Sequence, residues 1–272
     1  MRATGSVSRA AVAAALLMAA ATAASGDGVQ GKLVRRDTGG TIEGEITWFA
    51  GAREYGVTRG AEFSTRVPEA QVADVIVPKP AQLDQLAAMV KAGRHAEAAA
   101  PLADIVKRYE MLKWDVPAAR WLAEAYLNLN RLREAEEMCE KVFRASPDAR
   151  SSGELMRVYW DVLERGKKDA KLKAALEEAA RTGGRDVAAV AQLKRGDLER
   201  TGGDLKKALL DGYLRTVLMF GDVPAVQPEA LLKASECFQQ LGQAPYAERM
   251  RKQLLESYPQ SPEAQKVRSG GA

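Results

Sequence analysis

The sequence predicts a mainly α-helical protein: a solenoid of about five helix pairs, preceded by a small all-β module and an N-terminal signal segment. Three observations predict this fold class. Glycine or asparagine recurs about every 37 residues beyond residue 80, apolar residues alternate with period two between residues 29 and 77, and a short apolar run follows two arginines at the N-terminus. The 272 residues, 46% hydrophobic and 28% charged, exclude collagen-like, disulfide-rich and strongly disordered chains.

The first residues have the three parts of a secretory signal. Arg2 and Arg9 precede an uninterrupted apolar run over residues 10–21, and Ala21-Thr22-Ala23 is an Ala-x-Ala cleavage motif. The run is too short to span a bilayer of roughly 30 Å comfortably. We therefore expect residues 1–24 to be a Sec-type signal peptide, the mature chain to have no transmembrane segment, and the protein to be exported to the periplasm.

Charge and cysteine content limit the partners. Removing Arg2 and Arg9 with the signal lowers the formal net charge from +4 to +2, so the mature chain is not strongly basic and we expect no nucleic-acid partner. Cys139 and Cys237 lie far apart, in non-adjacent repeats. We interpret both as buried small hydrophobes and not as a disulfide.

Residues 25–78 read as the β module. Five short strands in about fifty residues predict a small closed barrel, because closure removes exposed strand edges. Pro78 and Pro80 then end the β segment, since proline removes ladder donors. The clearest alternation places Ile42, Gly44, Ile46 and Trp48 on one face of a strand, opposite Thr41, Glu43, Glu45 and Thr47.

The stretch Gly40-Thr41-Ile42-Glu43-Gly44-Glu45-Ile46 resembles the opening hairpin of SH3-like and Sm-like barrels. An Sm-like resemblance implies RNA binding, which the predicted export opposes. We therefore favour a packing or protein-contact module. The alternative is that this module binds nucleic acid or glycan and that the helices serve oligomerisation.

Beyond residue 80 the chain repeats itself. Glycine and asparagine tolerate the left-handed conformation that ends helices, and a small residue shortly after a turn allows two helices to cross closely. The predicted helix stops are Gly93, Asn130, Gly166, Gly203 and Gly242. The small residues that follow them by four or five positions are Ala98, Ala135, Ala170, Ala208 and Ala247.

The second and fifth units are the most detailed. Pro147 and Pro259 each lie 17 residues after the preceding helix stop, and the second unit reads WLAEAYLNLNRLREAEEMCEKVFRASP. This pattern resembles the tetratricopeptide repeat, whose period is about 34 residues. The resemblance implies that stacked helix pairs form one core over residues 79–265, with first helices lining a groove, and we expect a flexible tail over 266–272. The ending Tyr258–Ala264 looks like the closing segment of repeats in bacterial cell-envelope proteins.

The resemblance also implies a partner-binding groove on the first helices. In the second unit its residues are Arg120, Glu124, Leu127 and Asn128. In the fifth unit they are Leu232, Glu236, Gln239 and Gln240. Some family members bind a carboxylate of the partner through an asparagine. This chain has Glu124 and Glu236 at the equivalent positions, which disfavours recognition of a free acidic C-terminus. Extended peptides, helices and folded proteins stay open as partners.

We find no pattern that predicts catalysis. The single histidine, His95, has no nearby nucleophile in sequence and follows a helix stop, and no phosphate loop, zinc-spaced cysteine pair or calcium loop occurs. We therefore predict no enzyme, no catalytic residue, no cofactor and no metal. The expected function is a scaffold or adaptor for protein or peptide partners in envelope assembly or transport, with self-association left open; an enzyme subunit would need a polar pocket around His95.

Overall fold

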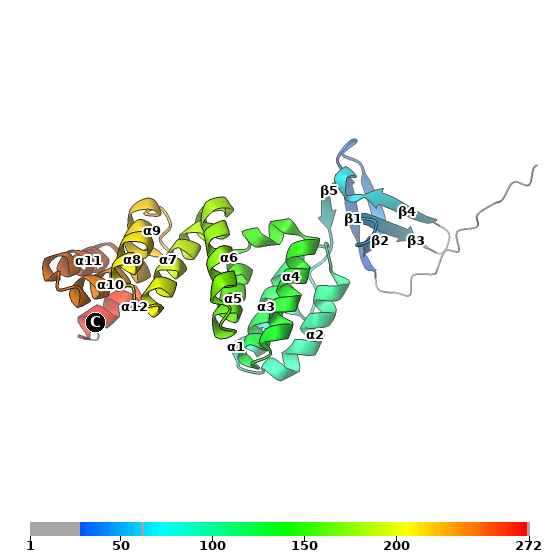
Figure 1. The fold of residues 1–272 in the computed structure, drawn as a ribbon. Helices are drawn as coiled ribbons and strands as arrows, with labels where there is room; N and C mark the ends of the chain where they lie inside the picture. Colours follow the sequence, from blue (N-terminus) through cyan, green and yellow to red (C-terminus); the bar gives the residue numbers. More distant parts are fainter. Residues whose placement is uncertain (1–27, 61–62, 271–272) are drawn as a thin grey trace, which may run out of the picture.

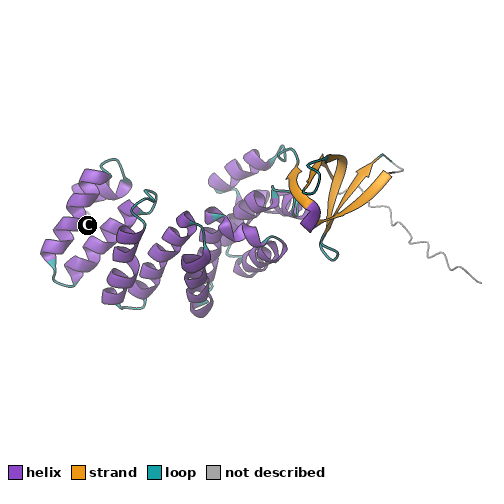
Figure 2. Ribbon diagram, turned by 90° about the horizontal axis from the view of Figure 1, so that it is seen from above, coloured by secondary structure: helices purple, strands orange, loops and turns teal. Residues whose placement is uncertain are grey.

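A computed structural model of the chain describes residues 28–60 and 63–270, so the predicted signal peptide lies outside the described residues. An antiparallel sheet stands at one end of an elongated row of helices, and the C-terminus lies at the other end (Figure 1). Seen from above, the helices follow one another in a single row that leads away from the strands (Figure 2).

The five predicted strands are confirmed. Their hydrogen-bonded order is β4-β3-β2-β1-β5, every pair is antiparallel, and the 3₁₀ turn η1 (Glu69–Gln71) joins β4 to β5. The predicted alternation holds, because Ile46 is fully buried while Glu43 is exposed and pairs with Lys32 at 2.6 Å on the opposite face. The strands are β1 (Val29–Arg35), β2 (Thr41–Phe49), β3 (Glu54–Arg59), β4 (Phe63–Pro68) and β5 (Val72–Ile76).

The pairings form an open sheet. Among the described residues no backbone ladder joins β4 to β5, so the closed barrel expected from the sequence is not what these hydrogen bonds make. Two side chains donate hydrogen bonds to backbone carbonyls of β5 and of the residue after it. The Arg36 guanidinium donates to Val72 O at 3.0 Å, and the Trp114 indole N–H donates to Val77 O at 3.2 Å. Side chains thus satisfy carbonyls that strand pairing could otherwise satisfy.

The helices form five hairpins followed by a single terminal helix. The hairpins are α1–α2, α3–α4, α5–α6, α7 with the segment α8–η3–α9, and α10–α11. This confirms the TPR-like arrangement, including the degenerate third unit. The bounds are α1 (Leu83–Lys91), α2 (His95–Arg108), α3 (Asp115–Asn128), α4 (Leu132–Ala145), α5 (Gly153–Arg165), α6 (Asp169–Thr182), α7 (Arg185–Thr201), α8 (Leu205–Lys207), the π-helix η3 (Ala208–Tyr213), α9 (Leu214–Met219), α10 (Gln227–Gln240), α11 (Ala244–Ser257) and α12 (Pro262–Arg268), with the 3₁₀ turn η2 (Pro147–Ser151) after α4.

The same helix-ending turn occurs five times. Gly93, Asn130, Gly203 and Gly242 adopt the left-handed φ angles of 57–87° that the sequence predicts. In the third hairpin the left-handed residue is Lys167 (φ 53°) and not Gly166. At each turn the next residue closes the helix by donating its N–H to a carbonyl five residues back. The five pairs are Arg94 to Met89, Arg131 to Tyr126, Lys168 to Leu163, Asp204 to Glu199 and Gln243 to Phe238.

This register corrects one predicted crossing residue. The side chain five positions after the left-handed residue is fully buried in four hairpins, at Ala98, Ala135, Ala208 and Ala247. Ala170 is exposed, and Leu172, which is five positions after Lys167, occupies the buried place. The prediction at Ala170 was wrong because the count began at Gly166.

The cores of the hairpins adjoin one another. One apolar cluster unites the sheet with α1–α3, a second spans α3–α7 and a third spans α7–α12. Trp160 is fully buried, and Trp114 and Trp121 pack partly against the first cluster, as predicted for core aromatics. Cys139 and Cys237 are buried and free, which confirms their interpretation, and burial raises the pKa of Cys139 to about 12.

The repeat region ends later than expected. Ser261 caps α12 by accepting a hydrogen bond from Ala264 N at 3.1 Å, and Ala264 is fully buried in the third cluster. Because this buried contact holds the helix, α12 continues to Arg268, into the segment 266–272 that was expected to be a flexible tail.

The fourth hairpin has an unusually close helix crossing. A Cβ added to Gly212 of η3 would overlap the Gly196 Cα of α7, so neither backbone can carry a side chain there. The π-helix contains this crossing and keeps Tyr213 fully buried, where its hydroxyl donates to Asp197 Oδ1 at 2.9 Å. The irregular helix is therefore packed tightly on its inner side.

The sheet docks on the connection between α2 and α3. That connection holds two left-handed non-glycine residues, Met111 (φ 60°) and Lys113 (φ 70°), with the fully buried Leu112 between them. Four polar contacts join it, or the end of α2, to the β module. They are Arg108 Nη2 to Gly28 O (3.1 Å), Tyr55 Oη to Met111 O (3.2 Å), Lys113 Nζ to Asp74 Oδ1 (2.7 Å) and Trp114 Nε1 to Val77 O (3.2 Å).

Candidate protein-interaction surface

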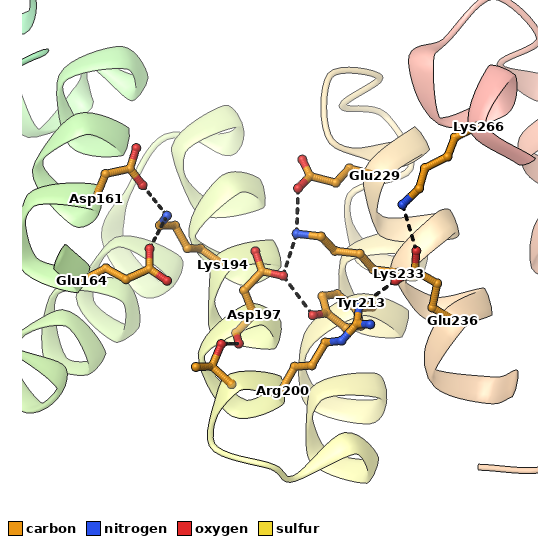
Figure 3. A network of polar contacts seen from close by, with 11 residues as sticks. Asp161, Glu164, Lys194, Asp197, Arg200, Tyr213, Glu229, Lys233, Glu236 and Lys266 are labelled. Atoms are coloured by element: carbon orange, nitrogen blue, oxygen red, sulfur yellow. Dashed lines mark hydrogen bonds and ion pairs between the residues drawn. The ribbon is translucent and has the colours of Figure 1, made fainter. Parts of the chain in front are cut away.

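Opposite charges join the first helices of successive hairpins, as Figure 3 shows for α5, α7, α10 and α12. Lys194 of α7 extends back to α5, where its Nζ pairs with Asp161 and lies 3.0 Å from Glu164 Oε2. Lys233 of α10 extends back to α7, where its Nζ lies 2.6 Å from Asp197 Oδ1. Each lysine therefore ties its own helix to the preceding hairpin.

The same pattern continues to the C-terminal helix. Arg200 Nη1 of α7 lies 2.7 Å from Glu236 Oε2 of α10, and Lys266 Nζ of α12 lies 3.5 Å from Glu236 Oε1. At the other end, Arg120 Nε of α3 lies 3.6 Å from Glu154 Oε2 of α5. We refer to these interhelical pairs together as the first-helix ladder, and it marks one face of the helix row.

The surroundings keep the lysines of the ladder charged. Burial lowers the pKa of Lys194 and of Lys233, but the adjacent carboxylates raise it by more, so both pKa values lie above the ordinary 10.5. The ladder therefore persists across the neutral range. It offers a partner alternating positive and negative groups and few apolar ones.

Sequence reasoning missed the ladder, although a signal exists. Asp197 precedes Lys233 by 36 residues, as Arg200 precedes Glu236, and this separation matches the spacing of the helix stops. Opposite charges one repeat apart on first helices could have identified these contacts. The consecutive acids Glu136 and Glu137 of α4 point in different directions: Glu136 is buried against Lys171 at 2.6 Å, whereas Glu137 is exposed.

The predicted groove residues of the second hairpin are only partly accessible. The Arg120 guanidinium stacks on the Trp121 ring at 3.4 Å and pairs with Glu124 at 3.2 Å. Asn128 is exposed and donates to Glu124 O at 2.8 Å. Leu127 was predicted to face a partner, but it is 6% exposed and belongs to the second core cluster, because α5 packs over that side of α3.

The predicted residues of the fifth hairpin do come together. Glu236, Gln239 and Gln240 line one cleft of about 390 Å³ with Arg251 of α11. Both glutamines are exposed, and Glu236 is held by Arg200 and Lys266. Leu232 was also predicted here, but at 6% exposed it lies in the third core cluster. The cleft is thus polar, with amide, carboxylate and guanidinium groups for hydrogen bonding.

A larger cleft, of about 540 Å³, lies where the sheet meets the helices. Tyr55 and Asp74 line it from the sheet, and Met111, Lys113 and Asp115 line it from the helical side. Burial raises the pKa of Asp115, whose Oδ2 accepts a hydrogen bond from Met111 N at 3.0 Å. Sequence reasoning missed this cleft because its two walls meet only when the sheet docks.

In the described part of the chain, neither a metal-binding group nor His95 contributes to these clefts. Within residues 28–60 and 63–270 no three or more His, Cys, Asp and Glu side chains gather as a metal-binding group. His95 is the first residue of α2 and lines neither cleft. A helix that crosses a membrane must be long and apolar, and no helix within residues 28–60 and 63–270 meets that need.

The fold and this surface define a protein of TPR-like helical repeats with a small antiparallel sheet at its N-terminal side. Residues 229–261, which contain most of α10 and all of α11, match the family model described as tetratricopeptide repeat. The match coincides with the fifth hairpin, in which Pro259 follows the helix stop Gly242 by 17 residues.

Comparison with solved structures finds helical-repeat proteins of low identity. The protein TTC0263 of Thermus thermophilus, described as a thermophilic TPR protein, is 21% identical, with 70% of this chain and 96% of that chain covered and a TM-score of 0.47. MamA of AMB-1 is 18% identical over 65% and 97% of the two chains, with a TM-score of 0.44. YrrB, described as a TPR protein with an unusual peptide-binding site, is 18% identical over 69% and 90%, with a TM-score of 0.43. No curated protein matches this chain.

Proposed function

We propose that the protein is a non-catalytic scaffold that binds a protein or peptide partner through the cleft of the fifth hairpin. The observation that carries this proposal is the convergence of Glu236, Gln239 and Gln240, predicted from the repeat register alone, around one cleft with Arg251. The family model that matches this hairpin supports it, since tetratricopeptide repeats serve protein interaction.

The composition of the cleft indicates how a partner is held. The two exposed glutamine amides can donate to and accept from an extended backbone. Arg251 pairs with Glu248 through Nη1 at 2.8 Å, and its remaining N–H groups can donate to a partner carboxylate. Glu236 already pairs with Arg200 and Lys266. It therefore holds these two cationic side chains in place and adds little net negative charge to the cleft. The expected partner is therefore a polar peptide segment with at least one acidic side chain.

Crosslinking in cells tests this proposal. A photo-crosslinking residue at Gln240 should capture a discrete partner, and the same residue at Gln253, which is exposed on α11 and does not line the cleft, should not. With the probe placed at Arg251 instead, the double variant Gln239→Ala/Gln240→Ala should reduce capture of that partner. Identical partner sets from positions 240 and 253 would argue against the cleft.

We also propose that the scaffold works outside the cytoplasm, in the assembly or transport of the cell envelope. The support is the sequence of residues 1–24, with its cationic start, apolar centre and Ala-x-Ala exit. Cell fractionation with N-terminal sequencing should find a periplasmic chain that begins after residues 1–24, at Ser25. A chain that retains Met1 and fractionates with the cytoplasm would contradict export while leaving the binding cleft unaffected.

A further inference from the structure

The fourth hairpin exposes an apolar stripe on its second helix. Leu218 is 79% exposed, Met219 is 56% exposed and Leu210 is 51% exposed. Leu210, Leu214 and Leu218 recur every fourth residue, so they follow one side of the continuous segment η3–α9. Leu214, in the middle, is half-buried and packs partly against the third core cluster, whereas Leu210 and Leu218 at its two ends are exposed. Single exposed leucines are ordinary on a protein surface, but an aligned series on one helix indicates an interaction site.

The opposite side of this segment is already buried. Leu209, Tyr213 and Val217 pack in the third core cluster, and the glycine crossing holds η3 against α7. The segment is therefore apolar on two sides, whereas a helix at the surface of a soluble protein normally has one apolar side. The inner side, with part of Leu214, stabilises the hairpin, which leaves the exposed Leu210 and Leu218 without a role in the fold.

The second helix of another hairpin shows the ordinary pattern. On α4, Arg133, Glu137 and Lys141 recur every fourth residue on the exposed side, and Arg133 Nε lies 2.7 Å from Glu137 Oε1. In the fourth hairpin leucines stand at this spacing instead. The substitution of leucines for charges thus distinguishes η3–α9 from α4.

Charged residues beside the stripe indicate what covers it. Asp211 and Arg215 are both exposed, and neither forms an ion pair with another residue of the described chain. They lie one turn apart beside the leucines. Where two identical helices pack antiparallel around a two-fold axis, corresponding flanks face each other, so Asp211 of one copy can meet Arg215 of the other.

We propose that the η3–α9 stripe is a self-association surface whose occupant is the same stripe of a second copy of this chain. With the axis near Leu214, Leu210 of each copy packs on Leu218 of the other, and two Asp211–Arg215 pairs form at once. The stripe is much smaller than the roughly 800 Å² per partner of a typical stable complex, so the dimer is weak and depends on concentration. It leaves the cleft of the fifth hairpin free, because that cleft lies on the first-helix side.

Sedimentation equilibrium of the purified protein over a wide concentration range tests the proposal. The wild type should pass reversibly from monomer to dimer, and Leu218→Asp should weaken the dimer about a hundredfold, because two exposed leucines lose their contact at once. Leu241→Asp, at an exposed leucine outside the stripe, is the matched control and should dimerise as the wild type does. Circular dichroism on each variant confirms that the helices remain folded.

A charge swap distinguishes this two-fold arrangement from nonspecific hydrophobic association. Asp211→Arg alone and Arg215→Asp alone should each weaken the dimer about tenfold, because like charges then meet across the axis. The double variant Asp211→Arg/Arg215→Asp should restore wild-type affinity. A wild type that stays monomeric at every concentration, a Leu218→Asp variant that still dimerises, or a double swap that fails to restore binding would each overturn the proposal.

Discussion

The two ends of the helix row are held by different forces. Where the sheet meets α2 and α3, three of the four polar contacts are side chains that donate to backbone carbonyls, the fourth is the Lys113–Asp74 ion pair, and one apolar cluster crosses the boundary. Between α5, α7, α10 and α12 the polar contacts are ion pairs between half-buried side chains. Neutral hydrogen bonds and apolar packing respond weakly to salt, whereas partly solvated ion pairs are screened.

This difference distinguishes the part of the molecule that we expect to be rigid from the part that we propose to bind a partner. The sheet and the first hairpins share one apolar cluster, and apart from the exposed Lys113–Asp74 pair the contacts between them change little with ionic conditions. The first-helix ladder lies on the face that we propose to bind a partner, so a charged partner can compete for its groups. The following predictions test that division, beginning with the largest effect.

Leu112→Ala should destabilise the sheet–helix boundary most. Leu112 is fully buried between the left-handed Met111 and Lys113, and its truncation leaves a cavity that costs about 3 kcal/mol of unfolding free energy. Urea unfolding measures the loss, which should be the same at low and at high sodium chloride. A loss that shrinks strongly with added salt would contradict the proposed apolar character of this boundary.

The Asp197–Lys233 pair should show the opposite behaviour. Lys233→Met leaves the half-buried Asp197 with one hydrogen bond, from Tyr213, and should cost about 1.5 kcal/mol. A double-mutant cycle with Asp197→Asn isolates the coupling energy of the two side chains, which should fall as salt is added. A coupling energy that does not change with salt would contradict the prediction, because the pair would then respond to salt as the sheet–helix contacts do.

Alkaline pH should remove the same contribution. The pKa of Lys233 in the folded chain lies above 10.5, because Asp197 and Glu229 outweigh the effect of burial. The stability that the pair provides is therefore complete below pH 10.5 and is lost as the pH rises through the folded-state pKa. The difference in unfolding free energy between wild type and Lys233→Met should stay constant from pH 7 to about pH 10 and then decrease.

Tyr55→Phe should have a smaller effect that does not depend on salt. The change removes only the hydroxyl that donates to Met111 O at 3.2 Å, while the ring keeps its packing against Trp48. We expect a loss of about 1 kcal/mol. Hydrogen exchange of amides in residues 109–114 should increase more than exchange in α10, and equal changes in both regions would argue against a local role.

Lys167→Gly changes neither region and should stabilise the chain slightly. Lys167 holds a left-handed conformation that glycine adopts without the Cβ penalty, and the gain is reduced by the greater freedom of glycine in the unfolded chain. The expected net increase in unfolding free energy is about 0.5 kcal/mol. Gly166→Ala is the matched comparison, since Gly166 has an ordinary negative φ of −74° and should show no strain of this kind.

The repeat period could be predicted from the sequence because four of the five turns use glycine or asparagine for a conformation that other residues avoid. The third turn could not be located exactly, since a lysine occupies the left-handed position. The strands were equally predictable from the alternation of apolar residues. The open sheet was not, because the carbonyl of Val77 accepts a hydrogen bond from Trp114, a side chain 37 positions away in the sequence.

The candidate site was predictable only in part. Helical spacing places Leu127 beside Glu124 and Leu232 beside Glu236, yet both leucines are buried by neighbouring hairpins. Spacing within one helix cannot show how far the next hairpin covers it. The exposed glutamines of the fifth hairpin do line a cleft together with Arg251, and their role in binding a partner stays a prediction.

The row of hairpins also has a mechanical consequence. Each rung of the ladder joins neighbouring hairpins, so a force applied between the sheet and α12 is carried by the hairpins in series. Under tension the hairpins would separate one after another, and the screened pairs around Asp197 and Glu236 would give way before the Leu112 region. The helix row would therefore lengthen first between α7 and α12, while the hairpins beside the sheet keep their packing.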